Sequence, residues 1–213
     1  MSSGGKDCTL ALDRARRQGY DVRYLANIYE GLTGRIRFHG LRRELIETQA
    51  WATGLEPILD HTHPEDFEPV FQRLLQGLKA RGCAGVLFGN IHLADVRAWY
   101  EERVIASGLA HIELVWGEPS MELVHEVVER GYHGLVVSVD LSQAAAPFLG
   151  RELDADLLTD IGITEDLDPC GERGEFHTFI YDGPEFRHPV PFERGQIVDK
   201  EGHRFVDLVP VAR

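Results

Sequence analysis

The sequence has few cysteines and no long apolar run. Cys8, Cys83 and Cys170 are odd in number and far apart, which excludes a disulfide framework and paired zinc-knuckle spacings. We expect reduced thiols. No apolar stretch approaches the roughly 20 residues that span a bilayer, and no basic segment followed by an apolar one opens the chain. We therefore expect a cytoplasmic protein that does not bind membranes.

Positive charge is also scarce. The 22 basic residues against 35 acidic ones give a net charge of −13, which repels phosphate backbones and anionic lipid surfaces. The charge therefore argues against general nucleic-acid binding. With 213 residues, 43% of them hydrophobic, the chain can bury a real core as one large domain or two small ones.

The first half alternates short apolar runs with amphipathic stretches, which predicts an α/β fold with a parallel sheet. The expected strands are 22–29, 57–62 and 85–89. The expected helices are 7–18, 39–53, 64–81 and 93–107. A glycine that can end the helix in a left-handed conformation follows each of them: Gly19, Gly54, Gly82 and Gly108.

The pattern changes after about residue 117. The expected elements there are a helix at 119–130, a buried strand at 135–139, a helix at 155–161 and antiparallel strands at 176–181, 196–199 and 204–209. The last two strands flank a turn at 200–203. We therefore predict a domain at 1–116 and a smaller α/β subdomain at 117–213, with the ligand in the groove between them.

The stretch Ser3-Gly4-Gly5-Lys6-Asp7 directly precedes a helical pattern. Two adjacent glycines let the backbone turn its N–H groups toward one point, and the helix start adds its positive dipole end, so the loop predicts an anion nest. Lys6 supplies a cation for phosphate and Asp7 an oxygen ligand for Mg²⁺, which makes both candidate catalytic residues. The alternative is an ordinary glycine turn with a solvated Lys-Asp pair.

This loop resembles the Ser-Gly-Gly-Lys-Asp-Ser signature of the PP-loop ATP pyrophosphatases, with Cys8 in the last position. Further stretches, in the right order, resemble one branch of that group, the diphthine–ammonia ligase family and its bacterial relatives. They are Phe38-His39 opening a helix, Gln49-Ala50, Gly89-Asn90-Ile91, Arg97, Glu101 and the stretch 171–178. The family more often carries Asp at the position of Asn90 and Glu at that of His177.

The resemblance implies an adenine-nucleotide α-hydrolase-like domain at 1–116 that binds ATP and Mg²⁺, the metal being held by Asp7. It implies that the enzyme adenylates a carboxylate on a protein side chain or a small metabolite, releases pyrophosphate and transfers ammonia. Assembly as a homodimer is left open. The expected ATP-binding residues are Ser3, Gly4, Gly5, Lys6, His39 and Gly89.

A second cluster, residues 171–178, carries two carboxylates and an imidazole before an apolar strand. Alternation along a strand that begins at Glu175 sends Glu175 and His177 to one face, where they could orient ammonia, accept a proton or hold a second cation. We expect both to be catalytic and, with Asn90 and Glu172, to bind substrate. The alternative is a solvated edge strand whose charges discourage aggregation.

Two other functions remain open: a sensor that holds ATP or AMP without turnover, and a PP-loop enzyme acting on tRNA. The charge of −13 and the absence of a Cys-x-x-Cys argue against the second. A parallel sheet with a phosphate loop also needs a strand that delivers the chain to that loop. We therefore expect an apolar run of about five to six residues ahead of Met1.

Overall fold

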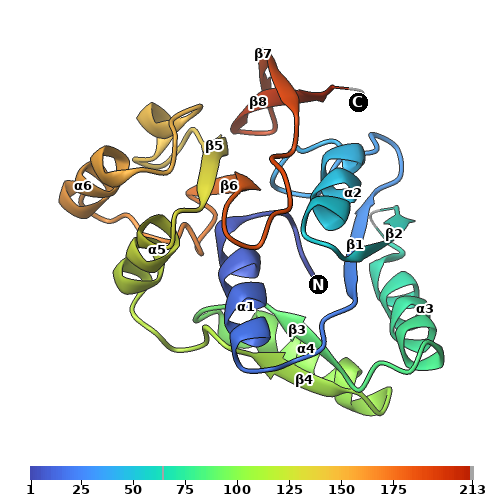
Figure 1. Ribbon diagram of the computed structural model, residues 1–213. Helices are drawn as coiled ribbons and strands as arrows, with labels where there is room; N and C mark the ends of the chain where they lie inside the picture. The colour runs from blue at the N-terminus through green and yellow to red at the C-terminus, as the bar shows by residue number, and fades with distance from the viewer. Residues whose placement is uncertain (64, 212–213) are drawn as a thin grey trace.

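The computed structural model describes residues 1–63 and 65–211, which form parallel β-α units followed by a four-stranded antiparallel sheet (Figure 1). The helices are α1 (Lys6–Arg17), α2 (Arg43–Ala52), α3 (Phe67–Ala80), α4 (Ala94–Ala106), α5 (Ser120–Glu129) and α6 (Ala155–Ile163), with a short 3-10 helix η1 (Ala146–Phe148). Within the described ranges, every helix is too short or too polar to cross a bilayer.

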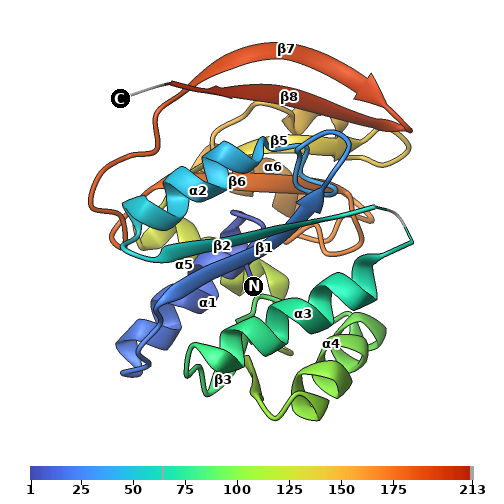
Figure 2. The ribbon, with the colours of Figure 1, turned by 90° about the vertical axis from the view of Figure 1, so that its right-hand side faces the viewer.

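The parallel strands form two separate pairs. Strand β1 (Tyr24–Glu30) pairs with β2 (Glu56–Thr62), and β3 (Gly85–Phe88) pairs with β4 (Ala110–Glu113). Figure 2 shows β1 and β2 side by side above α3 and α4. Strands β1 to β3 confirm the expected positions, whereas β4 was not expected because its four residues include a histidine and a glutamate.

The glycine signals for helix ends are confirmed. Gly19, Gly54, Gly82 and Gly108 all have positive φ and follow α1, α2, α3 and α4. The expected helix start at 39 is wrong, because α2 begins only at Arg43. Phe38 has φ 64° and Gly40 has φ 67°, so this segment turns before the helix can begin. The expected helix from Pro64 begins outside the described residues, and α3 starts at Phe67.

The second half forms a sheet of order β6-β5-β8-β7. Its strands are β5 (His133–Asp140), β6 (Phe176–Asp182), β7 (Phe192–Lys200) and β8 (His203–Pro210), and all neighbours are antiparallel. The expected antiparallel end and the turn between β7 and β8 are confirmed.

Strand β5 separates two hydrophobic clusters. Val136 and Val139 belong to one, with α1, α5 and α6, while Leu135 and Val137 belong to the other, with α2, β1 and β8. Leu135, Val136 and Val137 alternate between the two clusters as side chains along a strand do, and an irregularity between Val136 and Ser138 returns Val139 to the cluster of Val136. Both clusters contain residues from either side of the expected boundary at 116/117, and that boundary stays a prediction.

Candidate active site

The loop before α1 is held tightly between α2 and β6. Gly4 has φ 84°, and a Cβ there would lie 2.5 Å from Ile46 Cδ1. Gly5 is the N-cap residue of α1, and a Cβ there would lie 3.0 Å from His39 Cε1. The Gly4 carbonyl accepts hydrogen bonds from the Ile180 N–H at 2.9 Å and the Gln49 side chain at 3.0 Å. The glycines are therefore required by close packing as well as by the turn.

Backbone donors gather at the start of α1. The Lys6 N–H donates to Thr178 Oγ1 at 3.1 Å, while the N–H groups of Gly5 and Cys8 have no hydrogen-bond partner in the described part of the chain. Free N–H groups at a helix start, together with the helix dipole, favour an anion. Gly89 packs directly on this turn, because a Cβ there would lie 2.7 Å from the Cys8 nitrogen. The absence of a side chain at Gly89 thus lets its backbone lie against the start of α1.

Lys6 is buried beneath this nest. Its side chain is only 2% exposed, its Nζ donates to Asp7 Oδ2 at 2.9 Å and to the Cys170 carbonyl, and it lies 5.4 Å from the Phe176 ring centroid. Burial alone would lower the pKa of Lys6, but Asp7, Cys170 and Glu172 together outweigh it and raise that pKa. The alternative of a solvated Lys-Asp pair is therefore wrong.

Two carboxylates flank Lys6. Asp7 is 21% exposed, and burial raises its pKa although Lys6 acts in the opposite direction. Glu172 accepts a hydrogen bond from the Ile91 N–H at 3.3 Å, and burial and the Asp7 charge raise its pKa. Among the residues that the structure describes, no group of three or more His, Cys, Asp or Glu side chains is placed to hold a metal ion. A cation here would need oxygen ligands from phosphate and water as well.

Glu175 supports the loop that carries Glu172. Its side chain is fully buried, and Oε1 accepts hydrogen bonds from the Asp168 N–H at 2.8 Å and from Arg173 Nε at 3.0 Å. The expectation that Glu175 and His177 share a strand face is wrong, because β6 begins at Phe176 and the two side chains have different neighbours. The alternative interpretation of residues 171–178 as a solvated edge strand is also wrong for Glu175, because its side chain is buried.

His39 and His177 form a pair next to Gly5, with ring centroids 4.6 Å apart. His39 Nδ1 lies 3.1 Å from the Thr178 carbonyl, which can only accept, so we assign the ring proton to Nδ1. Burial lowers the pKa of His39 to about 4, although that hydrogen bond opposes it. Burial, His39 and Lys6 hold the pKa of His177 well below its usual range. Both imidazoles are therefore neutral at pH 7.

Asn90 belongs to a polar cluster at the ends of β3 and β4. Its side chain donates to Glu113 Oε1 at 2.7 Å, and Arg97 Nε lies 3.1 Å from Glu113 Oε2. The Arg97 guanidinium lies over the Trp116 ring, 4.5 Å from its centroid. Burial raises the pKa of Glu113, while Asn90 and Arg97 oppose that shift. The sequence analysis missed Glu113 and Trp116, because β4 itself was missed.

The structure thus brings the two expected motifs into direct contact. Three contributors that the sequence analysis did not assign to the site hold them together: Gln49, Cys170 and Thr178. Gln49 is a polar residue among the apolar residues that α2 buries, and this pattern could have indicated its structural role from the sequence. The Cys170 contact is made by a backbone carbonyl, and the sequence carries no signal for it.

Sequence comparison covers most of the chain. Residues 1–111 match the family described as diphthamide synthase N-terminal domain, and residues 119–208 match the diphthamide synthase C-terminal domain. A curated relative, the diphthine–ammonia ligase of Schizosaccharomyces pombe, is 26% identical over 94 residues. That match covers 43% of this chain and 16% of the relative, so the chain matches only about a sixth of the relative's length.

A solved structure also matches in part. It is described as a predicted subunit of tRNA methyltransferase from Methanocaldococcus jannaschii, and the TM-score is 0.47 at 16% sequence identity. The match covers 83% of this chain and 92% of that chain.

The packing of Gly4 predicts an unequal cost for two alanine substitutions. Gly4→Ala and Gly19→Ala both place a side chain at similar positive φ, which costs about 1–2 kcal/mol. Only Gly4 has neighbours within reach, since nothing lies within 4 Å of a Cβ at Gly19. Urea unfolding should therefore show Gly4→Ala to be less stable by about a further 1–3 kcal/mol. Equal losses would show that the loop is not tightly packed.

The lowered pKa of His39 predicts acid sensitivity. Because the folded protein keeps His39 neutral down to about pH 4 and the unfolded chain protonates it near 6.5, stability is full above pH 6.5 and falls as the pH drops toward 4. The free energy of unfolding should fall by about 2 kcal/mol between pH 7 and pH 5 from this residue. His39→Gln should remove that part of the slope, whereas His125→Gln, at an exposed position of α5, serves as control. An unchanged slope in His39→Gln would contradict the assignment.

Proposed function

The chain belongs to the diphthamide synthase family, and from that premise we propose that it is an ATP-dependent ligase that forms a C–N bond. A carboxylate oxygen of the acceptor attacks the α-phosphorus of ATP and pyrophosphate leaves. Ammonia nitrogen then attacks the activated carbonyl carbon and AMP leaves with the bonding electrons. The acceptor is a protein side chain or a small metabolite. The observation that carries the proposal is the buried Lys6 beneath a helix start with free N–H groups.

The residues present fit a triphosphate. The unpartnered N–H groups of Gly5 and Cys8 can donate to phosphate oxygens, and the α1 dipole adds positive potential at the same place. Lys6 supplies a fixed positive charge under these donors. Groups fixed in advance around developing charge stabilise a transition state without reorganising, and this supports catalysis at the α-phosphorus.

Asp7 and Glu172 would hold Mg²⁺. Burial raises the pKa of both carboxyl groups, and the Asp7 charge further raises that of Glu172. A divalent cation bound between them would favour their ionised forms. When bound, the metal would supply charge neutralisation at the phosphates. Asp7 and Glu172 together with Lys6 carry a formal charge of −1, so a metal-free site would repel a triphosphate overall.

The neutral His39 and His177 suit the ammonia step. Their lowered pKa values make both imidazoles weak bases. Their proposed role is therefore to accept hydrogen bonds from an amine and to hold it in place. Because His39 lies beside Gly5 and His177 contacts the His39 ring, an amine held by the pair would be close to the proposed phosphate nest. Glu175 acts through the loop that it supports, which makes it a positioning residue.

We also propose that residues 1–116 bind ATP and that residues 117–213 contribute groups to the acceptor and to ammonia. Asn90 would extend the acceptor site through its contact with Glu113. His39 and Gly89 shape the ATP site from the first part of the chain. Cys170 and Thr178 join the two parts at the nest.

The first test identifies the products of ATP cleavage. With ammonium and a panel of acceptors that includes a diphthine-bearing peptide and small carboxylic acids, the protein should form AMP and pyrophosphate. Lys6→Met and Asp7→Asn should lower the rate on the order of 100-fold, because each removes a charge that faces the phosphates. Lys200→Met, in the exposed hairpin, is the control. ADP as product, or unchanged rates in both variants, would refute the mechanism, and nucleotide binding without AMP formation would indicate a sensor.

A second test separates ATP binding from amide formation. His177→Asn should keep its affinity for a non-hydrolysable ATP analogue in calorimetry and lose amide formation, since its ring is not needed for phosphate charge. His125→Asn should keep both. Lost nucleotide affinity in a folded His177→Asn protein would move His177 into the ATP site and contradict its role toward ammonia.

A further inference from the structure

Strand β7 has a free edge. It is the last strand in the sheet order β6-β5-β8-β7, and it pairs with β8 along one side only. In Figure 2 it runs along the outer margin of the sheet, and the described part of the chain places no strand beyond it. Every residue of β7 after Phe192 is exposed. An uncovered edge of this kind can pair with a strand of another molecule.

This edge has an apolar centre and charged ends. Ile197 is 64% exposed and Val198 is 48% exposed, although both lie in mid-strand. Each end of β7 carries one acidic and one basic residue: Glu193 and Arg194 at the first end, Asp199 and Lys200 at the second. These four charges sum to zero in a chain whose net charge is −13. The edge therefore lacks the local negative charge that would keep two copies of the protein apart.

A β-bulge sets the direction of the charged side chains. The pairing with β8 shifts by one residue between Arg194 and Ile197, so β7 contains one extra residue there. Arg194 lies opposite Leu208 and Asp199 lies opposite Arg204. Because these two β8 residues are four positions apart, they point to the same face of the sheet, and so do Arg194 and Asp199.

The same shift brings Glu193 and Lys200 together on the other face. Their β8 partners, Val209 and His203, are six positions apart and also share a face. In a strand without a bulge, residues that are five or seven positions apart point to opposite faces. The bulge therefore gives each face of β7 one acidic and one basic residue, at opposite ends of the strand.

We propose that the β7 edge pairs antiparallel with the β7 edge of a second copy of this chain, in the register centred between residues 196 and 197. A twofold axis at that point places Glu193 opposite Lys200 of the second copy, and Arg194 opposite Asp199 of the second copy. Each pair occurs twice, and opposite charges directly across two strands stabilise their pairing. The exposed Ile197 side chains of the two copies meet beside the axis. The two four-stranded sheets become one continuous sheet.

The bulge also makes the edge selective. Bulges and charges on an edge strand ordinarily prevent pairing, because a regular strand cannot match both faces of a bulged one. A second copy of β7 carries the same bulge and meets the charges in reversed order. It therefore matches this edge where an unrelated strand leaves charges unpaired.

The Glu193–Lys200 pairs contribute most of the new charge pairing. Arg194 and Asp199 already have ion-pair partners within their own chain, at 2.8 and 2.7 Å. Glu193 has no salt bridge among the described residues, and the Lys200 ammonium lies 3.7 Å from Glu201 Oε1. Glu193 and Lys200 are therefore the positions at which to test the interface.

Charge reversal is the first test. Sedimentation equilibrium of the full chain should show a dimer at a concentration on the order of 100 µM, since a contact between strand edges is small. Glu193→Lys and Lys200→Glu each turn two attractive pairs into two repulsive ones, and each should raise Kd at least about tenfold. The double variant Glu193→Lys/Lys200→Glu restores opposite charges and should return Kd to within about threefold of the wild type.

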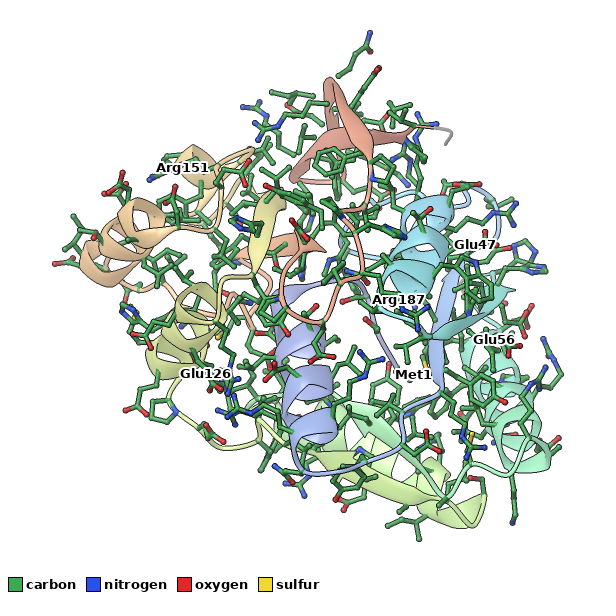
Figure 3. The ribbon with its side chains drawn as sticks, in the orientation of Figure 1. Met1, Glu47, Glu56, Glu126, Arg151 and Arg187 are labelled. Atoms are coloured by element: carbon green, nitrogen blue, oxygen red, sulfur yellow. The ribbon has the colours of Figure 1, made fainter. Side chains whose placement is uncertain are left out.

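Glu47→Lys is the matched control, because it makes the same charge change at an exposed position of α2. Figure 3 shows the side chains of the β7–β8 hairpin projecting from the molecule, with Glu47 away from them beside α2. Its Kd should equal that of the wild type. Recovery in the double variant also shows that loss of the dimer in either single variant is not caused by misfolding.

Cross-linking tests the register. When Glu193→Cys protein is mixed with Lys200→Cys protein and mildly oxidised, a disulfide should join the two variants, because directly opposite residues lie within its reach. Either variant alone should form no disulfide at the new cysteine, since the two copies of that residue would lie about 23 Å apart along the strands. Peptide mass mapping distinguishes these disulfides from any that involve Cys8, Cys83 or Cys170.

Three results would overturn the proposal. They are a monomeric wild type at the stated concentration, equal Kd values for Glu193→Lys and Glu47→Lys, and disulfides that form as readily within each cysteine variant as between the two. No nucleotide enters either measurement, so the outcome is independent of the proposed function.

Discussion

The buried ammonium of Lys6 is the constraint on which the site depends. A charge with almost no solvent contact needs compensating partners, and here they come from opposite ends of the sequence: Asp7 next to it and the Cys170 carbonyl far along the chain. The loop that carries Cys170 must therefore lie against α1. Glu175 keeps that loop in place through the Asp168 N–H, so a residue that faces no ligand still determines where the Lys6 charge lies.

The same arrangement sets the charge balance around the nest. Lys6 is offset by Asp7, and Glu172 adds a further negative charge, so the positive potential for an anion comes from the α1 start rather than from an excess of cations. The imidazoles of His39 and His177 are neutral and add no charge next to Gly5. Under the proposed function, nucleotide binding at this site would therefore need a divalent cation.

The sequence predicted what depends on local pattern. Helix α1, the glycines that end the helices and the β7–β8 hairpin were predicted from hydrophobic periodicity and from turn residues. Both signals lie within a few neighbouring residues. Strand β4 was missed because Ala110–Glu113 is short and half polar. The turn at Phe38 was missed because an aromatic residue with positive φ carries no local signal. Thr178 lies within the second cluster but was given no role in the site, because its contact with Lys6 joins residues 172 positions apart.

Strand β6 shows why the two halves act as one unit. It is an edge strand of the antiparallel sheet, and its Ile180 N–H and Thr178 hydroxyl are used to hold the loop at Gly4 and Lys6. The free backbone edge of β6, which could otherwise pair with another chain, is thereby covered by the loop at Gly4 and Lys6. The expected groove between subdomains is at this point a contact. The His39–His177 pair lies beside Gly5 at this contact, so the histidines that we propose to hold the amine belong to the same junction of the two halves as the loop at Gly4 and Lys6.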